Sequence, residues 1–236
     1  MNIGLIPQKW ARLTPTKTAI TDAENGNQVT FTELEELVVK IGNAFISIGL
    51  NKGDRVGILS KNSIEHLALF YACGRTGLVA QPMNWRLSAS EIIKIIENGK
   101  PKVMVTDSAL SNLVSQVQSR SDSVSLWYEY GNTGNGSFES LIQSQSTEQF
   151  QLSTYVGGVD PFFILYTGGT TGESKGALHS HESVWYGMQN QTVAERIVPS
   201  DVYMLTGQMF HIPVVLAMNY HAHGCPLVLM NFEASL

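Results

Sequence analysis

The sequence predicts an α/β fold built from mixed, largely parallel sheets with flanking helices. Short apolar runs rich in β-branched residues alternate along the 236-residue chain with segments whose apolar side chains recur at helical spacing. Two capping-box pairs, Thr30 with Glu33 and Ser88 with Glu91, mark helix starts between these runs. Hydrophobic residues make up 43% of the chain, which is enough to fill a sizeable core.

The first half of the chain shows this alternation most clearly. After the first capping box, residues 34–48 place apolar side chains at helical spacing, and Gly49 is suited to end that helix. Strands are expected where short apolar runs are bounded by polar residues and glycines. The further elements expected here are strands over residues 55–59, 78–82 and 102–106 and helices over residues 64–71 and 88–96.

A polar region separates this half from the next. Residues 131–136 have the composition of a surface loop, and residues 143–154 are rich in Gln, Ser and Thr, which is typical of a linker or an exposed crossing. Any subdomain boundary is therefore expected near residues 145–160. The α/β pattern resumes at Asp160, with helices expected over residues 182–195 and 214–220 and strands over residues 202–205 and 227–230.

Composition excludes several classes of function. The net charge is -5 and no basic stripe is present, so nucleic acid is not expected as a main partner. Cys73 and Cys225 are the only cysteines, too few for a disulfide framework and consistent with a reducing compartment. No apolar stretch has the length of a membrane span or signal peptide. We therefore expect a cytoplasmic protein, with peripheral membrane contact left open.

The most informative segment is residues 166–176, Tyr-Thr-Gly-Gly-Thr-Thr-Gly-Glu-Ser-Lys-Gly. It follows the apolar run at residues 162–165, an order that predicts a buried strand leading into a glycine-rich loop. Glycines let backbone N–H groups approach a polyphosphate, hydroxyls donate hydrogen bonds, and Lys175 supplies a positive charge. The segment therefore favours chemistry on a nucleoside triphosphate, although a purely structural turn is the main alternative.

Two better-known glycine motifs do not fit this segment. A Walker A loop needs Lys-Ser or Lys-Thr after its last glycine, whereas Lys175 precedes Gly176, and the dinucleotide pattern Gly-x-Gly-x-x-Gly is missing. Residues 172–176 do match the hydrolase elbow Gly-x-Ser-x-Gly, but six loop residues separate the match from Leu165. Since an elbow serine must follow its strand directly, the hydrolase interpretation is weak.

The histidines suggest a metal site only superficially. His179 with His181, and His221 with His223, would each lie on one face of an extended segment. Zinc needs three or four ligands, and no cysteine pair or carboxylate lies at ligand spacing, so structural histidines are the better explanation. His211, in Met-Phe-His-Ile-Pro, is by itself also more typical of a structural residue.

The glycine-rich segment resembles the signature loop of the adenylate-forming superfamily, whose usual form is Tyr-Thr-Ser-Gly-Thr-Thr-Gly-x-Pro-Lys-Gly. It departs from this usual form at Gly168, where serine is usual, and at Ser174, where proline is usual. Its Thr-Gly-Gly-Thr-Thr-Gly run resembles the variant seen in several fatty acyl-CoA synthetases. Four more segments are similar to family segments in order and spacing, so the resemblance covers nearly the whole chain. They are residues 29–34, 53–63, 74–91 and 209–211.

The resemblance implies an ATP-dependent acid–thiol ligase that forms acyl-CoA through an acyl-adenylate. It implies ATP and Mg²⁺ as cofactors, CoA as co-substrate, a small carboxylic acid as substrate, and a family that is often homodimeric. His211 would border the acyl pocket, and aryl acids remain open beside fatty acids. The residues implied to bind ATP and pyrophosphate are Thr167, Gly168, Gly169, Thr170, Thr171, Gly172 and Lys175.

By the same resemblance, residues 1–236 correspond to an incomplete N-terminal AMP-binding domain. The family's magnesium-ligand glutamate, ribose-binding aspartate and C-terminal lysine would lie beyond residue 236, so no catalytic residue is expected in this portion, and the isolated chain is expected to be inactive. The alternative is a catalytically dead nucleotide-binding or scaffold fragment, which the sequence downstream of the chain would distinguish.

Overall fold

A computed structural model describes residues 1–131, 137–152, 154–167 and 174–231. In this part of the chain a six-stranded sheet has the order β6-β5-β3-β4-β7-β8. Its pairs are parallel except for the antiparallel β7–β8 hairpin. The strands are β3 (Arg55–Leu59), β4 (Val79–Pro82), β5 (Val103–Asp107), β6 (Leu126–Tyr130), β7 (Pro161–Thr167) and β8 (Lys175–Ser180).

A second sheet of four described strands has the order β2-β1-β10-β9. Strand β10 pairs in parallel with β1 and with β9, whereas β1 and β2 are antiparallel. Both sheets are therefore mixed and largely parallel, which confirms the predicted fold class. The strands are β1 (Thr18–Asp22), β2 (Gln28–Thr30), β9 (Tyr203–Leu205) and β10 (Leu227–Leu229).

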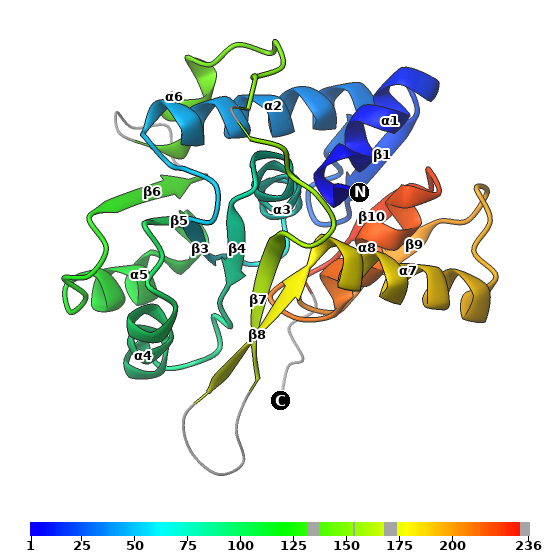
Figure 1. Cartoon of the computed structure of the whole chain (residues 1–236). Helices are drawn as coiled ribbons and strands as arrows, with labels where there is room; N and C mark the ends of the chain where they lie inside the picture. The colour runs from blue at the N-terminus through cyan, green and yellow to red at the C-terminus, as the bar shows by residue number, and fades with distance from the viewer. Residues whose placement is uncertain (132–136, 153, 168–173, 232–236) are drawn as a thin grey trace.

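Helices flank both sheets. In Figure 1, α2 crosses the top of the molecule, α4 and α5 lie at the lower left beside the six-stranded sheet, and α7 and α8 lie at the right. The helices are α1 (Ile6–Leu13), α2 (Phe31–Ser47), α3 (Ile64–Thr76), α4 (Ala89–Gly99), α5 (Ser111–Gln118), α6 (Phe138–Gln143), α7 (His181–Glu195) and α8 (Pro213–Ala222), with 3-10 turns η1 (Ile3–Leu5) and η2 (Ser108–Leu110).

Both predicted capping boxes are formed. The Thr30 hydroxyl accepts a hydrogen bond from the Glu33 amide at 3.2 Å, and the Glu33 carboxylate accepts one from the Thr30 amide at 2.7 Å. This bond to Thr30 holds the pKa of Glu33 below its ordinary value. Ser88 and Glu91 form the same pair at the start of α4. Gly49 follows α2 with a φ of 84°, a left-handed conformation that suits glycine.

Helix α3 lies at the centre of the core, and every residue from His66 to Thr76 is buried. Two of its polar side chains make long-range contacts. The Tyr71 hydroxyl bonds His221 Nδ1 at 2.9 Å, and His221 Nε2 bonds the Ala19 carbonyl at 3.0 Å. Arg75 forms a two-bond pair with the Glu35 carboxylate at 2.6 and 2.7 Å. These contacts tie α3 to α8, β1 and α2.

One sequence expectation about the histidines is wrong. His221 and His223 do not lie on an extended segment, because His221 belongs to α8 and His223 follows its last residue. Positions i and i+2 lie on different sides of a helix, so the two imidazoles have different surroundings. His221 is buried in the core, whereas His223 Nε2 contacts the Thr192 hydroxyl at 3.0 Å.

The polar crossing after α6 is held against α2. The Asn43 amide group donates to the carbonyls of Ser146 and Glu148 at 2.9 and 3.1 Å. The Phe150 ring covers Gly42 so closely that a Cβ there would lie 2.3 Å from its Cε1. The crossing is therefore fixed on the surface. A subdomain boundary near residues 145–160 stays a prediction.

We expect Glu35→Ala to lower the free energy of unfolding by about 3 kcal/mol, because it leaves a buried guanidinium without its carboxylate partner. The side chains of Arg75 and Glu35 are only 3% and 12% exposed. Lys102→Ala is the control, since Lys102 is 55% exposed in its ion pair with Asp54, and its loss should cost less than about 1 kcal/mol. Urea unfolding of both variants measures the difference, and equal losses would contradict the prediction.

The stability of the fold should depend on pH through three histidines. Burial lowers the pKa of His66, His181 and His221 to about 4, below the ordinary value of 6.5. The unfolded chain therefore binds more protons than the folded chain between these values, and stability should fall as the pH falls from 6.5 towards 4. His66→Phe should reduce the stability difference between pH 7 and pH 5 in urea unfolding. His211→Ala, at an exposed position, should leave it unchanged.

Candidate functional site

The β7–β8 hairpin brings two predicted phosphate-binding residues together. Thr167 ends β7 and pairs directly with Lys175, the first residue of β8. Both lie at the carboxyl end of β7, the edge where ligands bind in open α/β sheets. The other residues predicted to contact phosphate fall outside the described residues. They are Gly168, Gly169, Thr170, Thr171 and Gly172.

Tyr166 anchors the end of the hairpin that adjoins the predicted phosphate loop. Its hydroxyl donates a 2.8 Å hydrogen bond to Asn98 Oδ1 in α4, and burial raises its pKa, so the hydroxyl remains a neutral donor. Its ring lies across Gly176, where a Cβ would come within 3.0 Å of the Tyr166 Cζ and 2.8 Å of Ile164 Cγ2. Glycine at position 176 thus lets the tyrosine cross the neighbouring strand and reach α4.

Side-chain alternation places the charged end and an apolar end on one face of the hairpin. The paired positions Thr167–Lys175 and Phe163–His179 are separated by four residues along each strand. Because side chains of every second residue share a face, both pairs project to the same side. At a rise of about 3.3 Å per residue, they lie about 13 Å apart.

An apolar cavity of about 260 Å³ opens beside the second pair. It lies between the hairpin and helices α7 and α8, and its position was not predicted from the sequence. The run Val-Val-Leu at residues 214–216 was a signal for apolar packing but not for a cavity. The lining residues are Phe163, His179, Ser183, Val184, Gly187, Gln191, Ile212, Val215 and Leu216.

His211 lies next to this cavity in sequence and is exposed. It stands in the turn between β9 and α8, where its amide donates to the Gln208 carbonyl at 3.1 Å and its carbonyl accepts from the Val214 amide at 3.2 Å. Neighbouring Phe210 lines a small cavity of about 60 Å³ together with Tyr166 and Ser174 of the hairpin. The turn that carries His211 therefore adjoins both the apolar cavity and the base of the predicted phosphate loop.

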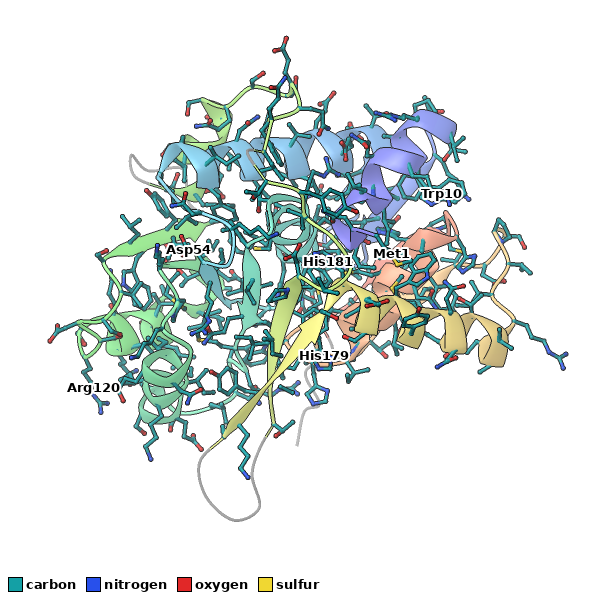
Figure 2. All side chains as sticks on the ribbon, viewed as in Figure 1. Met1, Trp10, Asp54, Arg120, His179 and His181 are labelled. Atoms are coloured by element: carbon teal, nitrogen blue, oxygen red, sulfur yellow. The ribbon has the colours of Figure 1, made fainter. Side chains whose placement is uncertain are left out.

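The other histidines have packing roles. His181 Nδ1 accepts a hydrogen bond from the Ile3 amide at 3.1 Å, and its ring stacks on Phe162 at 4.7 Å. His179 packs on Phe163 at 4.9 Å. Figure 2 shows His181 beside the N-terminus and His179 further along the hairpin. In the described part of the chain, no three His, Cys, Asp or Glu side chains are placed together to hold a metal ion.

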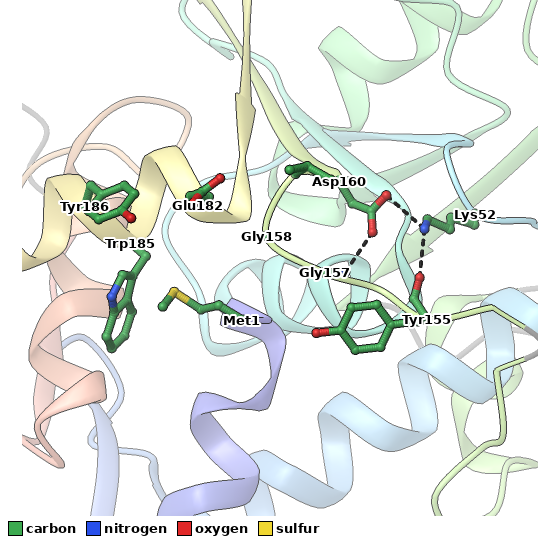
Figure 3. Close-up of a pocket in the computed structure, with 10 residues that line it drawn as sticks. Met1, Lys52, Tyr155, Gly157, Gly158, Asp160, Glu182, Trp185 and Tyr186 are labelled. Atoms are coloured by element: carbon green, nitrogen blue, oxygen red, sulfur yellow. Dashed lines mark hydrogen bonds and ion pairs between the residues drawn. The ribbon is translucent and has the colours of Figure 1, made fainter.

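A larger surface pocket of about 520 Å³ lies at the opposite end of β7 (Figure 3). Here Asp160 pairs with Lys52 at 2.8 Å and accepts from the Gly157 amide at 2.7 Å. The hydrogen bond from Lys52 is the main cause that lowers the pKa of Asp160. Since Asp160 and Thr167 stand at opposite ends of β7, this pocket is remote from the predicted phosphate loop.

None of the helices in the described ranges combines the length and apolar character needed to cross a lipid bilayer.

Known proteins of similar sequence are CoA ligases. The chain is 28% identical to a long-chain-fatty-acid–CoA ligase FadD13 of Mycobacterium tuberculosis, over 99% of this chain and 46% of that protein. It is 29% identical to an indoleacetate–CoA ligase of Aromatoleum aromaticum, over 86% of this chain and 40% of that protein. The chain thus spans about half the length of the curated relatives that it matches.

Solved structures agree with the sequence comparison. The inhibitor-bound N-terminal domain of FACL13 from Mycobacterium tuberculosis superimposes with a TM-score of 0.90 at 28% identity, covering 99% of this chain and 58% of that one. A Mycobacterium tuberculosis fatty acyl CoA synthetase gives a TM-score of 0.86 at 27% identity, with 99% and 46% covered. The family model described as "AMP-binding enzyme" matches residues 7–235. The chain therefore belongs to the AMP-binding enzyme family.

Proposed function

We propose that this chain supplies the N-terminal portion of an ATP-dependent acid–thiol ligase that forms acyl-CoA. The observation that carries the proposal is the shared face of the β7–β8 hairpin, which presents Thr167 and Lys175 at one end and the apolar cavity at the other. A carboxylic acid with an apolar tail has these same two parts. An acid of that kind, about as long as the 13 Å between the two pairs, could place its tail in the cavity and its carboxylate beside a nucleotide whose pyrophosphate contacts Lys175.

The reaction has two steps. A carboxylate oxygen attacks the α-phosphorus of ATP, the bond to the β-phosphate oxygen breaks, and pyrophosphate leaves. The thiolate of CoA, having lost its proton, then attacks the acyl carbon, and AMP leaves with the electron pair of the broken C–O bond. Lys175, Thr167 and the loop between them would stabilise the charge that develops on pyrophosphate.

Activity is expected only from a protein that also carries the downstream parts named by the resemblance. The described residues contain no cluster suited to a metal ion. We therefore expect the isolated 236-residue chain to show no acid-dependent ATP–pyrophosphate exchange, whereas the full-length protein should show it with long-chain acids. Exchange by the chain alone would contradict the first expectation. Its absence from the full-length protein would favour the nucleotide-binding or scaffold alternative.

Replacing Lys175 tests the phosphate site directly. In the full-length protein, Lys175→Met should lower kcat/KM for ATP by about 100-fold, because one group that stabilises the transition state is removed. The KM for the acid should change little. Lys94→Met, at an exposed position of α4, is the matched control and should leave both parameters unchanged. Steady-state kinetics with each substrate varied in turn make the comparison.

His211 is proposed to border the acyl site. We expect His211→Ala to slow acyl transfer to CoA by about tenfold, the factor that corresponds to about 1.4 kcal/mol of lost contact. Nucleotide binding should be less affected. Single-turnover measurements of adenylation and thiolation separate the two steps, with His223→Ala as a control outside the turn. Unchanged rates for both half-reactions would refute the assignment.

A further inference from the structure

Asn62 occupies a junction between the two sheets. It lies between β3 and α3 and is 4% exposed. Its Nδ2 donates to the carbonyls of Gly207 and Met230, and its Oδ1 accepts from the Met209 amide, each at 2.9 Å. Both amide hydrogens and the carbonyl oxygen of the side chain are therefore engaged with main-chain groups.

The main chain of Asn62 makes a second set of bonds at the same junction. Its amide donates to Asn231 Oδ1, and its carbonyl accepts from Asn231 Nδ2, both at 2.9 Å. Together the bonds join the β3–α3 connection to the turn after β9 and to the residues after β10. A junction of this kind could serve only to hold the two sheets together, as many buried amides do.

The contacts to the turn go further than such a structural role requires. The Asn62 side chain holds Gly207 and Met209, which flank Gln208, and Trp85 Nε1 donates to Gln208 Oε1 at 3.0 Å. Residues 207–209 of the turn are thus held by side chains of residues outside the turn. Gly207 is also packed against α8, since a Cβ there would lie 2.4 Å from Pro213 Cγ.

These residues directly precede Phe210 and His211, and Met209 is fully buried. We propose that Asn62 is a positioning residue for the acyl site. By fixing the main chain of residues 207–209, its side chain sets where Phe210 and His211 stand between the apolar cavity and the base of the predicted phosphate loop. The effect on the acid rests on the proposed function, whereas the effect on the turn does not.

Two variants separate positioning from the joining of the sheets. Asn62→Asp has the same shape and keeps the acceptor for Met209, but it loses both donors and places a carboxylate against two carbonyl oxygens. Asn231→Ala is the matched control, because it removes the bonds to the main chain of Asn62 while leaving all three side-chain contacts in place. Thermal unfolding of both variants verifies that they fold.

In the full-length protein, Asn62→Asp should raise KM for a long-chain acid about tenfold, equivalent to about 1.4 kcal/mol, while KM for ATP stays within about twofold. Asn231→Ala should leave both values within about twofold. Equal changes in the two KM values, or the same acid effect in Asn231→Ala, would overturn the proposal. A wild-type protein without acid-dependent activity would instead count against the proposed function.

Hydrogen exchange tests the turn independently of activity. In the 236-residue chain, Asn62→Ala should speed exchange of the His211 amide, which bonds Gln208, by at least about tenfold relative to wild type. Asn231→Ala should not. Equal exchange of this amide in the two variants would show that Asn62 only joins the sheets, whatever the enzyme assays give.

Discussion

The burial of helix α3 from His66 to Thr76 is the constraint on which the rest of the structure depends. A helix buried on all sides must satisfy its polar side chains within the protein, because leaving them unpaired in the core is costly. Tyr71 does so through His221 and the Ala19 carbonyl, and Arg75 through Glu35 and the Gly4 carbonyl. These pairs reach elements from both ends of the chain, so the core forms only when those segments are in place together.

The same helix orders the carboxyl edges of the sheets. The connection into α3 carries Asn62, which bonds the segments that follow β9 and β10. Strand β7 lies beside β4 in the six-stranded sheet, and Phe70 of α3 contacts its Phe162 and Phe163 rings. The hairpin and the turn with His211 are thereby placed against a common element, an arrangement that would suit the proposed alignment of two substrates.

Sequence reasoning succeeded where the signal is local. Capping boxes and apolar periodicity located α2, α4 and the central parallel strands, since each depends on residues a few positions apart.

Sequence reasoning failed where an element depends on contacts with residues that are distant in the sequence. Strand β8 was not predicted, because Gly176 and exposed Leu178 become a strand only by pairing with β7. His221 and His223 alternate as in a strand, but the apolar run before them packs as a helix. The phosphate loop stays a prediction from composition. The Tyr166–Asn98 contact was not predicted, because it joins residues 68 positions apart.

Under the proposed function, the hairpin would serve two unlike parts of a substrate with one short motif. Strand alternation puts Thr167 and Lys175 on the face that carries Phe163 and His179, while Tyr166 uses the other face to hold α4. Anchoring and binding are therefore assigned to opposite faces of the same two strands. Gly176 is the point where they meet, because any side chain there would displace the Tyr166 ring. A side chain at position 176 would disturb Tyr166 and, through the strand, the position of Lys175, so the glycine is part of the anchor rather than of the predicted phosphate loop.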